Sequence, residues 1–210
     1  MLLADIDIAK RLVDPDDHRR LVITPIISAK KQFGPSSLDV HLSTDFQRLE
    51  NMNRSHIDLD ERPSADEKVY REGKRILLAA NESFFLHPNE FVLASTLEFF
   101  RLPDDLAGRI EGRSSWGRQG LLVHATAGFV DPGFAGVLTL ELSNVGRLPI
   151  RLTPGLRIAQ VCFFQMLTRS LVPYYAKHGA KYFEATTLES SKADSDTEVS
   201  DSPNSGQKSS

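Results

Sequence analysis

Cysteine is nearly missing from this sequence. The one cysteine, Cys162, lies in the apolar run VCFF. A single cysteine excludes an intrachain disulfide and is typical of a reducing cytoplasm. It also excludes the zinc site of the common nucleobase deaminases, which takes at least two cysteines. The six histidines show no ligand spacing. We therefore expect no zinc and no metal-binding residues in the chain.

Long hydrophobic runs are also missing. The longest are short stretches such as ILLAA at 76–80, far below the roughly 20 residues that span a membrane. The opening MLLADIDIAKRL carries acids where a signal peptide needs a basic start. We expect a cytoplasmic protein that does not enter membranes.

An excess of positive charge is the third absence. The formal net charge is −3, and residues 189–210 contain five acids and two lysines, which also sum to −3. The other 188 residues are therefore neutral as a whole. A neutral body argues against broad nucleic-acid binding, so arginines in a site must act locally on a small anion.

The residues that are present predict a mainly β chain. LADIDIAKRLVD predicts a short amphipathic helix with Asp5 as N-cap and an apolar series at Ile6, Ala9 and Val13. SLDVHLSTDFQRL (37–49) alternates as a strand does, and the polar stretch 50–75 predicts a loop or extended hairpin. From 76 onward, short strands including 121–130, 136–144 and 157–167 are separated by Gly and Pro turns, which predicts a sandwich or barrel. Residues 1–188 form one predicted domain, followed by a disordered Ser/Asp-rich tail at 189–210.

Glu141 lies in the apolar run GVLTLELSN. In a strand, Leu138, Leu140 and Leu142 would share one face, and Thr139 and Glu141 would share the other. The simpler interpretation is a strand with one solvated face. The alternative is a carboxylate held on a rigid strand inside a pocket.

Two neighbouring motifs bear on that choice. Arg113, Ser114, Ser115 and Arg118 carry guanidinium and hydroxyl groups that are suited to phosphate oxygens. An equally good alternative is a helix that Ser114 or Ser115 caps, with solvated arginines. Asp131 opens the turn DPGFAG at the end of an apolar run, where it could act as a base or contact a sugar.

Together these motifs resemble the dCTP deaminase branch of the trimeric dUTPase-like family. The resemblance runs from the first helix to residue 182 and is densest at GRSSWGRQGLLVHATAGFVDPGFAGVLTLELSN and LPIRLTPGLRIAQ. PSSLDVHL (35–42) and FFLHPNEFVLAST (84–96) match further blocks of the family. Several motifs in order over most of a chain are far more specific than any one pattern.

The resemblance implies a distorted β-barrel or jelly-roll subunit with a short N-terminal helix and few other helices. It implies a homotrimer with three active sites at subunit interfaces, and zinc-independent hydrolytic deamination of dCTP. Glu141 falls on the family's catalytic glutamate, which activates water and passes a proton to ammonia. Arg118 would keep Glu141 ionised and oriented, Ser114 would bond the water or the base, and the backbone around Ala127 would bind the tetrahedral intermediate.

The same resemblance implies how the nucleotide binds. Asp131 would bind the 3′-hydroxyl, Phe134 would pack on the sugar and disfavour a 2′-hydroxyl, and Tyr174 and Lys181 would close over the phosphates. Magnesium would arrive with the triphosphate. The family also suggests dTTP as an inhibitor. In full, the implied nucleotide-binding residues are Arg113, Ser114, Ser115, Trp116, Gly117, Arg118, Ala127, Asp131, Phe134, Thr139, Leu140, Glu141, Gln160, Tyr174 and Lys181.

A dipeptide after Thr126-Ala127 points to a second reaction. Gly128 and Phe129 stand where monofunctional bacterial members carry a bulkier residue, and they resemble bifunctional members that also cleave dUTP to dUMP and pyrophosphate for thymidylate synthesis. A glycine would leave room for a water near the α-phosphate, and Asp131 could be its base.

The chain departs from the family after Tyr182. Where the family has a Gln- or Gly-rich closing arm, this chain has Phe183-Glu184-Ala185-Thr186. A deaminase that releases dUTP and a catalytically weak nucleotide-binding regulator therefore remain as alternatives. Retention of Glu141, Arg118, Ser114 and Asp131 together argues against the regulator. A pure dUTPase is disfavoured because it has no use for a buried glutamate at 141 and because its Gly-rich terminal motif is absent.

Overall fold

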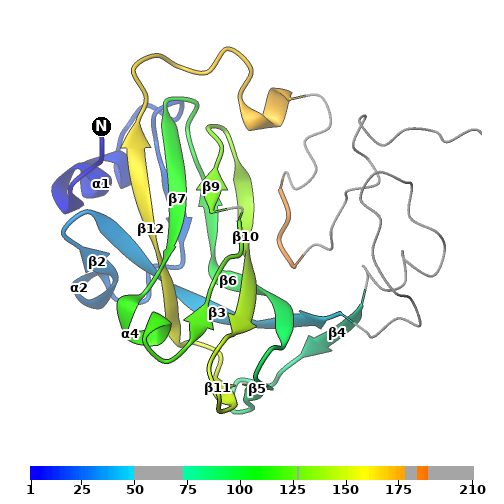
Figure 1. Ribbon diagram of the computed structural model, residues 1–210. Helices are drawn as coiled ribbons and strands as arrows, with labels where there is room; N and C mark the ends of the chain where they lie inside the picture. The colour runs from blue at the N-terminus through cyan, green and yellow to red at the C-terminus, as the bar shows by residue number, and fades with distance from the viewer. Residues whose placement is uncertain (50–72, 127, 178–183, 189–210) are drawn as a thin grey trace, which may run out of the picture.

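The computed structural model of the 210-residue chain describes residues 1–49, 73–126, 128–177 and 184–188, and it is mainly β as predicted (Figure 1). Strand β3 (Ser37–Arg48) confirms the strand predicted at 37–49, although its burial does not alternate, because residues on both faces are buried. Most of the predicted loop or hairpin at 50–75 and the predicted tail at 189–210 lie outside the described residues. The elements are α1 (Asp5–Leu12), β1 (Val22–Thr24), α2 (Ala29–Gln32), β2 (Phe33–Gly34), β3 (Ser37–Arg48), β4 (Lys74–Leu77), β5 (Phe84–Leu86), β6 (Phe91–Arg101), β7 (Leu106–Gly112), α4 (Ser114–Gly117), β8 (Leu121–Leu122), β9 (Phe129–Val130), β10 (Ala135–Asn144), β11 (Ile150–Leu152), β12 (Arg157–Gln165) and the 3-10 helix η1 (Tyr174–Ala176).

One large antiparallel sheet dominates the described chain. Its strands follow the order β8-β10-β6-β3-β12-β7-β9, with β1, β2 and β4 paired to its sides, while β11 and β5 form a separate two-stranded sheet. Neighbours in this order are mostly distant in sequence, as in β12 beside β3 and β7. The sheet therefore brings together segments from both halves of the chain.

The strand order requires the sheet to curl. β8 and β9 lie at opposite ends of the order, yet only residues 123–128 separate them in sequence. Six strand spacings in a flat sheet would be about 28 Å, whereas the connecting chain reaches about 25 Å at full extension. The connection bonds to both sides: Glu141 N donates to Val123 O at 3.1 Å, and Ile110 N donates to Gly128 O at 2.7 Å. β10 and β7 therefore approach each other across this connection, and the sheet forms the predicted distorted barrel.

This connection corrects the predicted strand at 121–130. Only its ends are strands: β8 pairs with β10, and β9 pairs with β7. The residues between them cross from one edge of the sheet to the other, so they cannot pair continuously with either neighbour. Local β propensity could not reveal that crossing, because the pairing partners lie elsewhere in the sequence.

The barrel interior holds the core. Phe46, Phe100 and Phe163 are its largest fully buried side chains and come from β3, β6 and β12. Phe46 stacks on Phe84 with ring centroids 4.9 Å apart. Burial of this kind stabilises the fold by about 25 cal/mol for each Å² of apolar surface removed from water.

Helix α1 forms where predicted, but two details of the prediction are wrong. Its N-cap position is Ala4, not Asp5, and Asp5 is the first helical residue. The predicted apolar series faces outward: Ile6 is 61% exposed and Val13 is 78% exposed. Ile8 and Arg11 are buried instead.

The side chain of Arg11 sets the rotation of α1. Its Nη1 donates to Asp105 Oδ2 at 3.0 Å, and its Nη2 contacts the other carboxylate oxygen. Gln165 donates to the same carboxylate at 3.3 Å. Burial raises the pKa of Asp105, but the hydrogen bonds from Arg11 and Gln165 outweigh it and hold that pKa below its ordinary value. The ion pair thus ties α1 to the loop between β6 and β7.

In the described ranges, no helix combines the length and apolar character that crossing a membrane requires.

Candidate active site

Strand β10 carries Glu141 as the alternation predicts. Leu138, Leu140 and Leu142 are at most 4% exposed and point into the core, while Thr139 and Glu141 are half-buried on the opposite face. Leu140 was expected to bind nucleotide. Because its side chain is enclosed in the core, only its main chain could face a ligand.

The Glu141 carboxylate is held by backbone amides. Its Oε2 accepts from Ala125 N at 2.7 Å, and Thr126 N lies at 3.4 Å from the same oxygen. Amide bonds to an ionised carboxylate are charge-assisted and fix its direction. These contacts favour a held carboxylate over a freely solvated one. Sequence reasoning missed Ala125 and Thr126, because a backbone donor leaves no side-chain signature.

Gly128 closes the other end of the same connection. A Cβ at Gly128 would lie 3.0 Å from Ile110 O and 3.2 Å from His124 Cε1, so the absence of a side chain allows tight packing here. The neighbouring Phe129 is 62% exposed. The packing gives Gly128 a structural reason of its own, and its role in a second reaction stays a prediction.

The DPGF turn (131–134) and η1 form one unit at the start of β10. Tyr174 N donates to Pro132 O at 2.8 Å, and the rings of Phe134 and Tyr174 meet at a centroid distance of 5.6 Å. Asp131 faces Lys177, whose Nζ lies 4.0 Å from its Oδ2. The structure therefore brings together three predicted residues, Asp131, Phe134 and Tyr174. Of the predicted residues, Ala127 and Lys181 lie outside the described residues.

A short C-terminal segment, 184–188, lies against the beginning of β10. Glu184 N donates to Ala135 O at 2.7 Å, and Val137 N donates to Ala185 O at 2.8 Å. A Cβ on Gly136 would come within 3.0 Å of Ala185 O, so a glycine is required at this contact. The segment that departs from the family pattern is thus docked through its main chain.

The segment ends in a buried residue. Leu188 is 6% exposed, and its amide donates to Asp45 Oδ2 at 3.1 Å. The predicted domain boundary at 188 therefore coincides with a packed side chain.

The predicted phosphate cluster surrounds α4. The helix begins at Ser114, and the N-cap position is Arg113, with no side-chain cap. The alternative in which Ser114 or Ser115 caps a helix is therefore wrong. Ser114, Ser115, Gly117 and Arg118 are exposed. Exposed hydroxyls and a guanidinium on a short helix can approach an anion without displacing packed groups.

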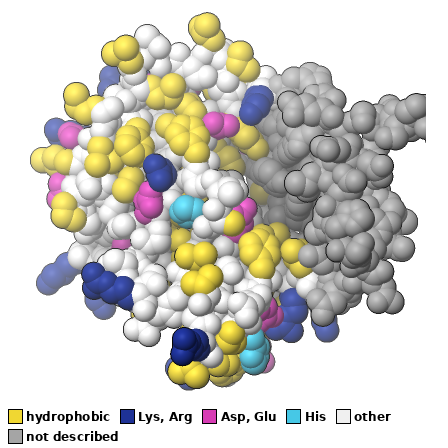
Figure 2. Space-filling view, in the orientation of Figure 1, with side chains coloured by type: hydrophobic (Ala, Val, Ile, Leu, Met, Phe, Trp, Pro, Cys, Tyr) yellow, Lys and Arg dark blue, Asp and Glu magenta, His cyan; other side chains and the backbone are white. Residues whose placement is uncertain are grey.

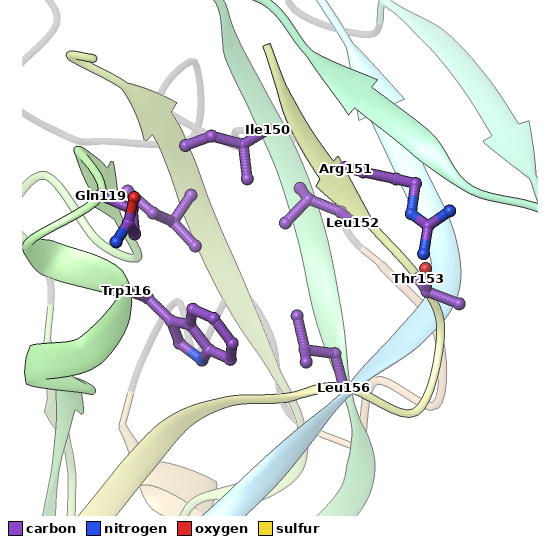
Figure 3. Close-up of a pocket in the computed structure, with 8 residues that line it drawn as sticks. Trp116, Gln119, Ile150, Arg151, Leu152, Thr153 and Leu156 are labelled. Carbon is purple, nitrogen blue, oxygen red and sulfur yellow. The ribbon is translucent and has the colours of Figure 1, made fainter. Parts of the chain in front are cut away.

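Trp116 and Gln160 serve the structure of this region. The Trp116 indole donates to Arg157 O at 2.8 Å, and Gln160 Oε1 accepts from Ser37 Oγ at 3.1 Å. Trp116 also forms one wall of a pocket of about 190 Å³ beside β11, where Leu156 lies across from it (Figure 3). That pocket is smaller than the roughly 300–1,000 Å³ typical of ligand sites, and it contains none of the predicted catalytic residues.

The predicted site is divided within one chain. Figure 1 places α4 toward one end of the barrel and η1 toward the other. Among the described residues, no ion pair joins Arg118 to Glu141. The described residues also contain no group of three or more His, Cys, Asp or Glu side chains placed to hold a metal. The predicted pairing of Arg118 with Glu141 stays a prediction.

Comparison with known proteins gives a consistent family. Residues 3–166 match the family described as dCTP deaminase-like. The chain is 46% identical over 183 residues to "dCTP deaminase, dUMP-forming" of Dictyoglomus turgidum, covering 87% of this chain and 89% of that protein. It is 49% identical over 187 residues to the protein of the same name from Mycobacterium sp. (strain KMS), covering 87% and 90%.

A solved structure shares the fold. The crystal structure of 2′-deoxycytidine 5′-triphosphate deaminase from Agrobacterium tumefaciens superposes with a TM-score of 0.57 at 24% identity. The superposition covers 77% of this chain and 46% of that longer chain. The family match spans most of the sequence, and both curated relatives align along nearly their whole length. The chain belongs to the dCTP deaminase-like family.

Proposed function

We propose that this protein hydrolyses dCTP to dUTP and ammonia and then cleaves dUTP to dUMP and pyrophosphate in the same site. The observation that carries the proposal is the Glu141 carboxylate, held on β10 by the amides of Ala125 and Thr126. The curated relatives bear the name "dCTP deaminase, dUMP-forming", which supports both steps.

Glu141 would transfer protons in the first reaction. It takes a proton from water, whose oxygen bonds to the ring carbon that carries the amino group. Glu141 then returns the proton to the amino nitrogen, the carbon–nitrogen bond breaks, and ammonia leaves. Backbone amides bind Oε2, so Oε1 of the same carboxylate would face the water. A base held on a strand keeps its oxygen within reach of the proton throughout.

The resemblance supplies the remaining groups for this step. Ser114 would bond the water or the base, and Arg118 would orient Glu141. The backbone at Ala127 would bind the tetrahedral intermediate. These roles are consistent with the exposure of Ser114 and Arg118 on α4.

The unit formed by the DPGF turn and η1 would hold the sugar. Asp131 would accept from the 3′-hydroxyl, and Phe134 would cover the sugar face. Tyr174 would lie over the phosphates, because its ring already packs against Phe134. Thr139 and the main chain of Leu140 would line the base pocket.

Asp131 would also serve the second reaction. A water activated by Asp131 would attack the α-phosphorus. The bond from the α-phosphorus to the oxygen that bridges it to the β-phosphorus would break, and pyrophosphate would leave. Gly128 and Phe129 would border this water. Lys177 Nζ lies 4.0 Å from Asp131 Oδ2 and would hold the carboxylate in place.

A homotrimer would complete the site. Helix α4 and η1 lie toward opposite ends of one barrel, so α4 of one copy would meet the DPGF turn and η1 of its neighbour at a subunit interface (Figure 1). Large apolar side chains are exposed on the chain surface, including Leu148 at 77%, Leu167 at 102% and Leu171 at 99%. Figure 2 shows apolar side chains across the upper part of the side in view. Exposed apolar surface of this kind is typical of a face that another subunit covers.

Magnesium would be bound by the triphosphate oxygens and water, and Arg113 and Arg118 would balance the remaining charge. The reaction would take place in the cytoplasm, where a free Cys162 stays reduced.

The test is to incubate the protein with dCTP and magnesium and to follow ammonia, dUTP, dUMP and pyrophosphate separately. The proposal expects ammonia and dUMP in equal amounts. Release of ammonia with dUTP alone would leave a monofunctional deaminase. Binding of dCTP without ammonia would indicate a nucleotide-binding regulator and would overturn the enzymatic proposal.

A further inference from the structure

The block PSSLDVHL supplies two polar side chains to strand β3, and neither has yet been given a role. Ser37 and Asp39 alternate along β3, which pairs with β12 so that Asp39 lies opposite Gln160. Ser37 Oγ donates to Gln160 Oε1 at 3.1 Å. Gln160 is one of the predicted nucleotide-binding residues. A side chain of β3 therefore already holds one of them.

Asp39 holds another of the predicted nucleotide-binding residues, Arg113. Its Oδ2 forms ion pairs with Arg157 Nη1 at 3.0 Å and with Arg113 Nη2 at 3.4 Å. Arg113 Nη1 also donates to Arg157 O at 3.2 Å. The guanidinium of Arg113 is thus fixed from two sides, by a carboxylate of β3 and by a carbonyl of β12. Arg157 is fixed in turn, because its Nη1 donates to Lys31 O at 2.6 Å.

The charges of this cluster do not cancel. One carboxylate faces two guanidinium groups, so a net positive charge remains. The Asp39 side chain is 13% exposed, whereas those of Arg113 and Arg157 are 25% and 35% exposed. The anion is therefore the covered member and the cations reach solvent. Each guanidinium has five N–H donors, and the contacts described here use only some of them.

Such an arrangement favours a bound polyanion for two reasons. A free arginine side chain loses considerable rotamer freedom when a ligand immobilises it, and Asp39 imposes that loss before binding. The surplus positive charge then attracts phosphate oxygens, which the planar guanidinium binds with two parallel hydrogen bonds.

We propose that Asp39 is a positioning residue that presents Arg113 to the triphosphate of the nucleotide, with Arg157 holding Asp39 in place. The inference rests on the proposed nucleotide site at Arg113. Asp39 itself does not touch the nucleotide. Its effect on binding therefore passes through Arg113.

The experiment compares Asp39→Asn with a matched control, Asp17→Asn. Asp17 also lies between two arginines, Arg101 at 2.9 Å and Arg20, but it lies in a turn after α1 and its side chain is 58% exposed. Asp39→Asn should raise the KM for dCTP about tenfold and leave kcat within twofold, because a charge-assisted contact orients the phosphate-binding group and not the base. Asp17→Asn should change neither constant.

A double-mutant cycle separates positioning from general stabilisation. If Asp39 acts through Arg113, then Asp39→Asn should have no further effect on KM in an Arg113→Ala background. An unchanged KM in Asp39→Asn, or an equal rise in both backgrounds, would overturn the inference. Arg113→Lys provides a second variant if Asp39→Asn does not fold. Lysine keeps the charge but lacks the planar fork by which the guanidinium contacts Asp39 and Arg157 O at once, so a wild-type KM in Arg113→Lys would also overturn the inference.

Calorimetric binding of dCTP with magnesium, and of inorganic tripolyphosphate, gives a readout that does not depend on turnover. Loss of tripolyphosphate affinity in Asp39→Asn but not in Asp17→Asn supports the inference even for a protein that does not deaminate. Unchanged affinity in both variants overturns it. Failure of the proposed function would instead appear as wild-type binding without ammonia release.

Discussion

Replacing Glu141 by glutamine tests the centre of the proposed chemistry. Ala125 N bonds to Glu141 Oε2 at 2.7 Å, and the amide oxygen of glutamine reaches the same position. The connection that carries Ala125 should therefore keep its place, while the charge and the proton acceptor are lost. A positioned general base contributes about 10²–10⁴ in rate, and Glu141 serves two proton transfers. We expect kcat for deamination to fall by about 10⁴, the upper end of this range, which is equivalent to roughly 5 kcal/mol of activation free energy.

Shortening the side chain tests position instead of charge. Glu141→Asp withdraws the carboxylate by about 1.5 Å, one carbon–carbon bond, and so breaks the contact with Ala125 N. A misplacement of this size costs on the order of 10²-fold in rate. Ammonia release with dCTP and magnesium gives kcat, calorimetry gives nucleotide affinity, and sedimentation gives the oligomeric state.

Glu82→Gln is the matched control. Its carboxylate also accepts a backbone amide, from Ala79 at 2.8 Å, but in an exposed turn. It should keep wild-type turnover. Near-normal deamination by Glu141→Gln, with binding and assembly intact, would rule out Glu141 as the base.

Three further perturbations address the second reaction and the packing. Gly128→His should lower the ratio of dUMP to dUTP among the products, because the imidazole would occupy the space proposed for the water near the α-phosphate; an unchanged ratio by chromatography would remove Gly128 from the second step. Asp105→Asn should lower the free energy of unfolding by about 3–5 kcal/mol at pH 7, because it leaves the Arg11 charge buried and unpaired. The pKa of Asp105 is lower in the folded state, so its contribution to the free energy of unfolding is present above the unfolded pKa of about 3.9 and is lost as the pH falls through the folded value. In guanidinium unfolding, the difference in free energy between wild type and Asp105→Asn should therefore shrink below about pH 4. A difference that stays constant with pH would contradict the ion-pair explanation. Leu188→Ala should lower the free energy of unfolding by about 2–5 kcal/mol, whereas deletion of 189–210 should leave the melting temperature unchanged; equal effects in calorimetry would contradict the boundary at 188.

Local periodicity was enough to predict the strand that carries Glu141. Leu138, Leu140 and Leu142 alternate with polar residues, and the structure places them in the core. Period-2 alternation is a local signal, so it survives without knowledge of the partner strands. The mainly β class followed from many such segments, and the family followed from motifs that span most of the chain.

Contacts between distant segments could not be predicted in this way. The outward face of α1 was assigned to the core because Arg11 reads as a surface residue until Asp105 is known to lie beside it. The run 121–130 reads as one strand until its ends are seen to pair at opposite edges of the sheet. The amide of Ala125 that binds Glu141 has no sequence signal at all. In each case the missing information was the position of a partner remote in sequence.

In the contact between β10 and the segment 184–188, the residue that the contact requires lies on β10, and the side chains that can vary lie on the segment. Val137 N and Ala135 O bond to the main chain of Ala185 and Glu184, and any non-proline residue offers the same atoms. The steric requirement falls on Gly136 of the receiving strand, where a methyl group would meet Ala185 O at 3.0 Å. Ala185 and Thr186 are therefore free to differ from the family pattern without losing this contact, whereas Glu184 has a φ of 57°, a conformation that favours glycine or asparagine. A designer who wished to alter substrate preference could vary these side chains while leaving Gly136 untouched.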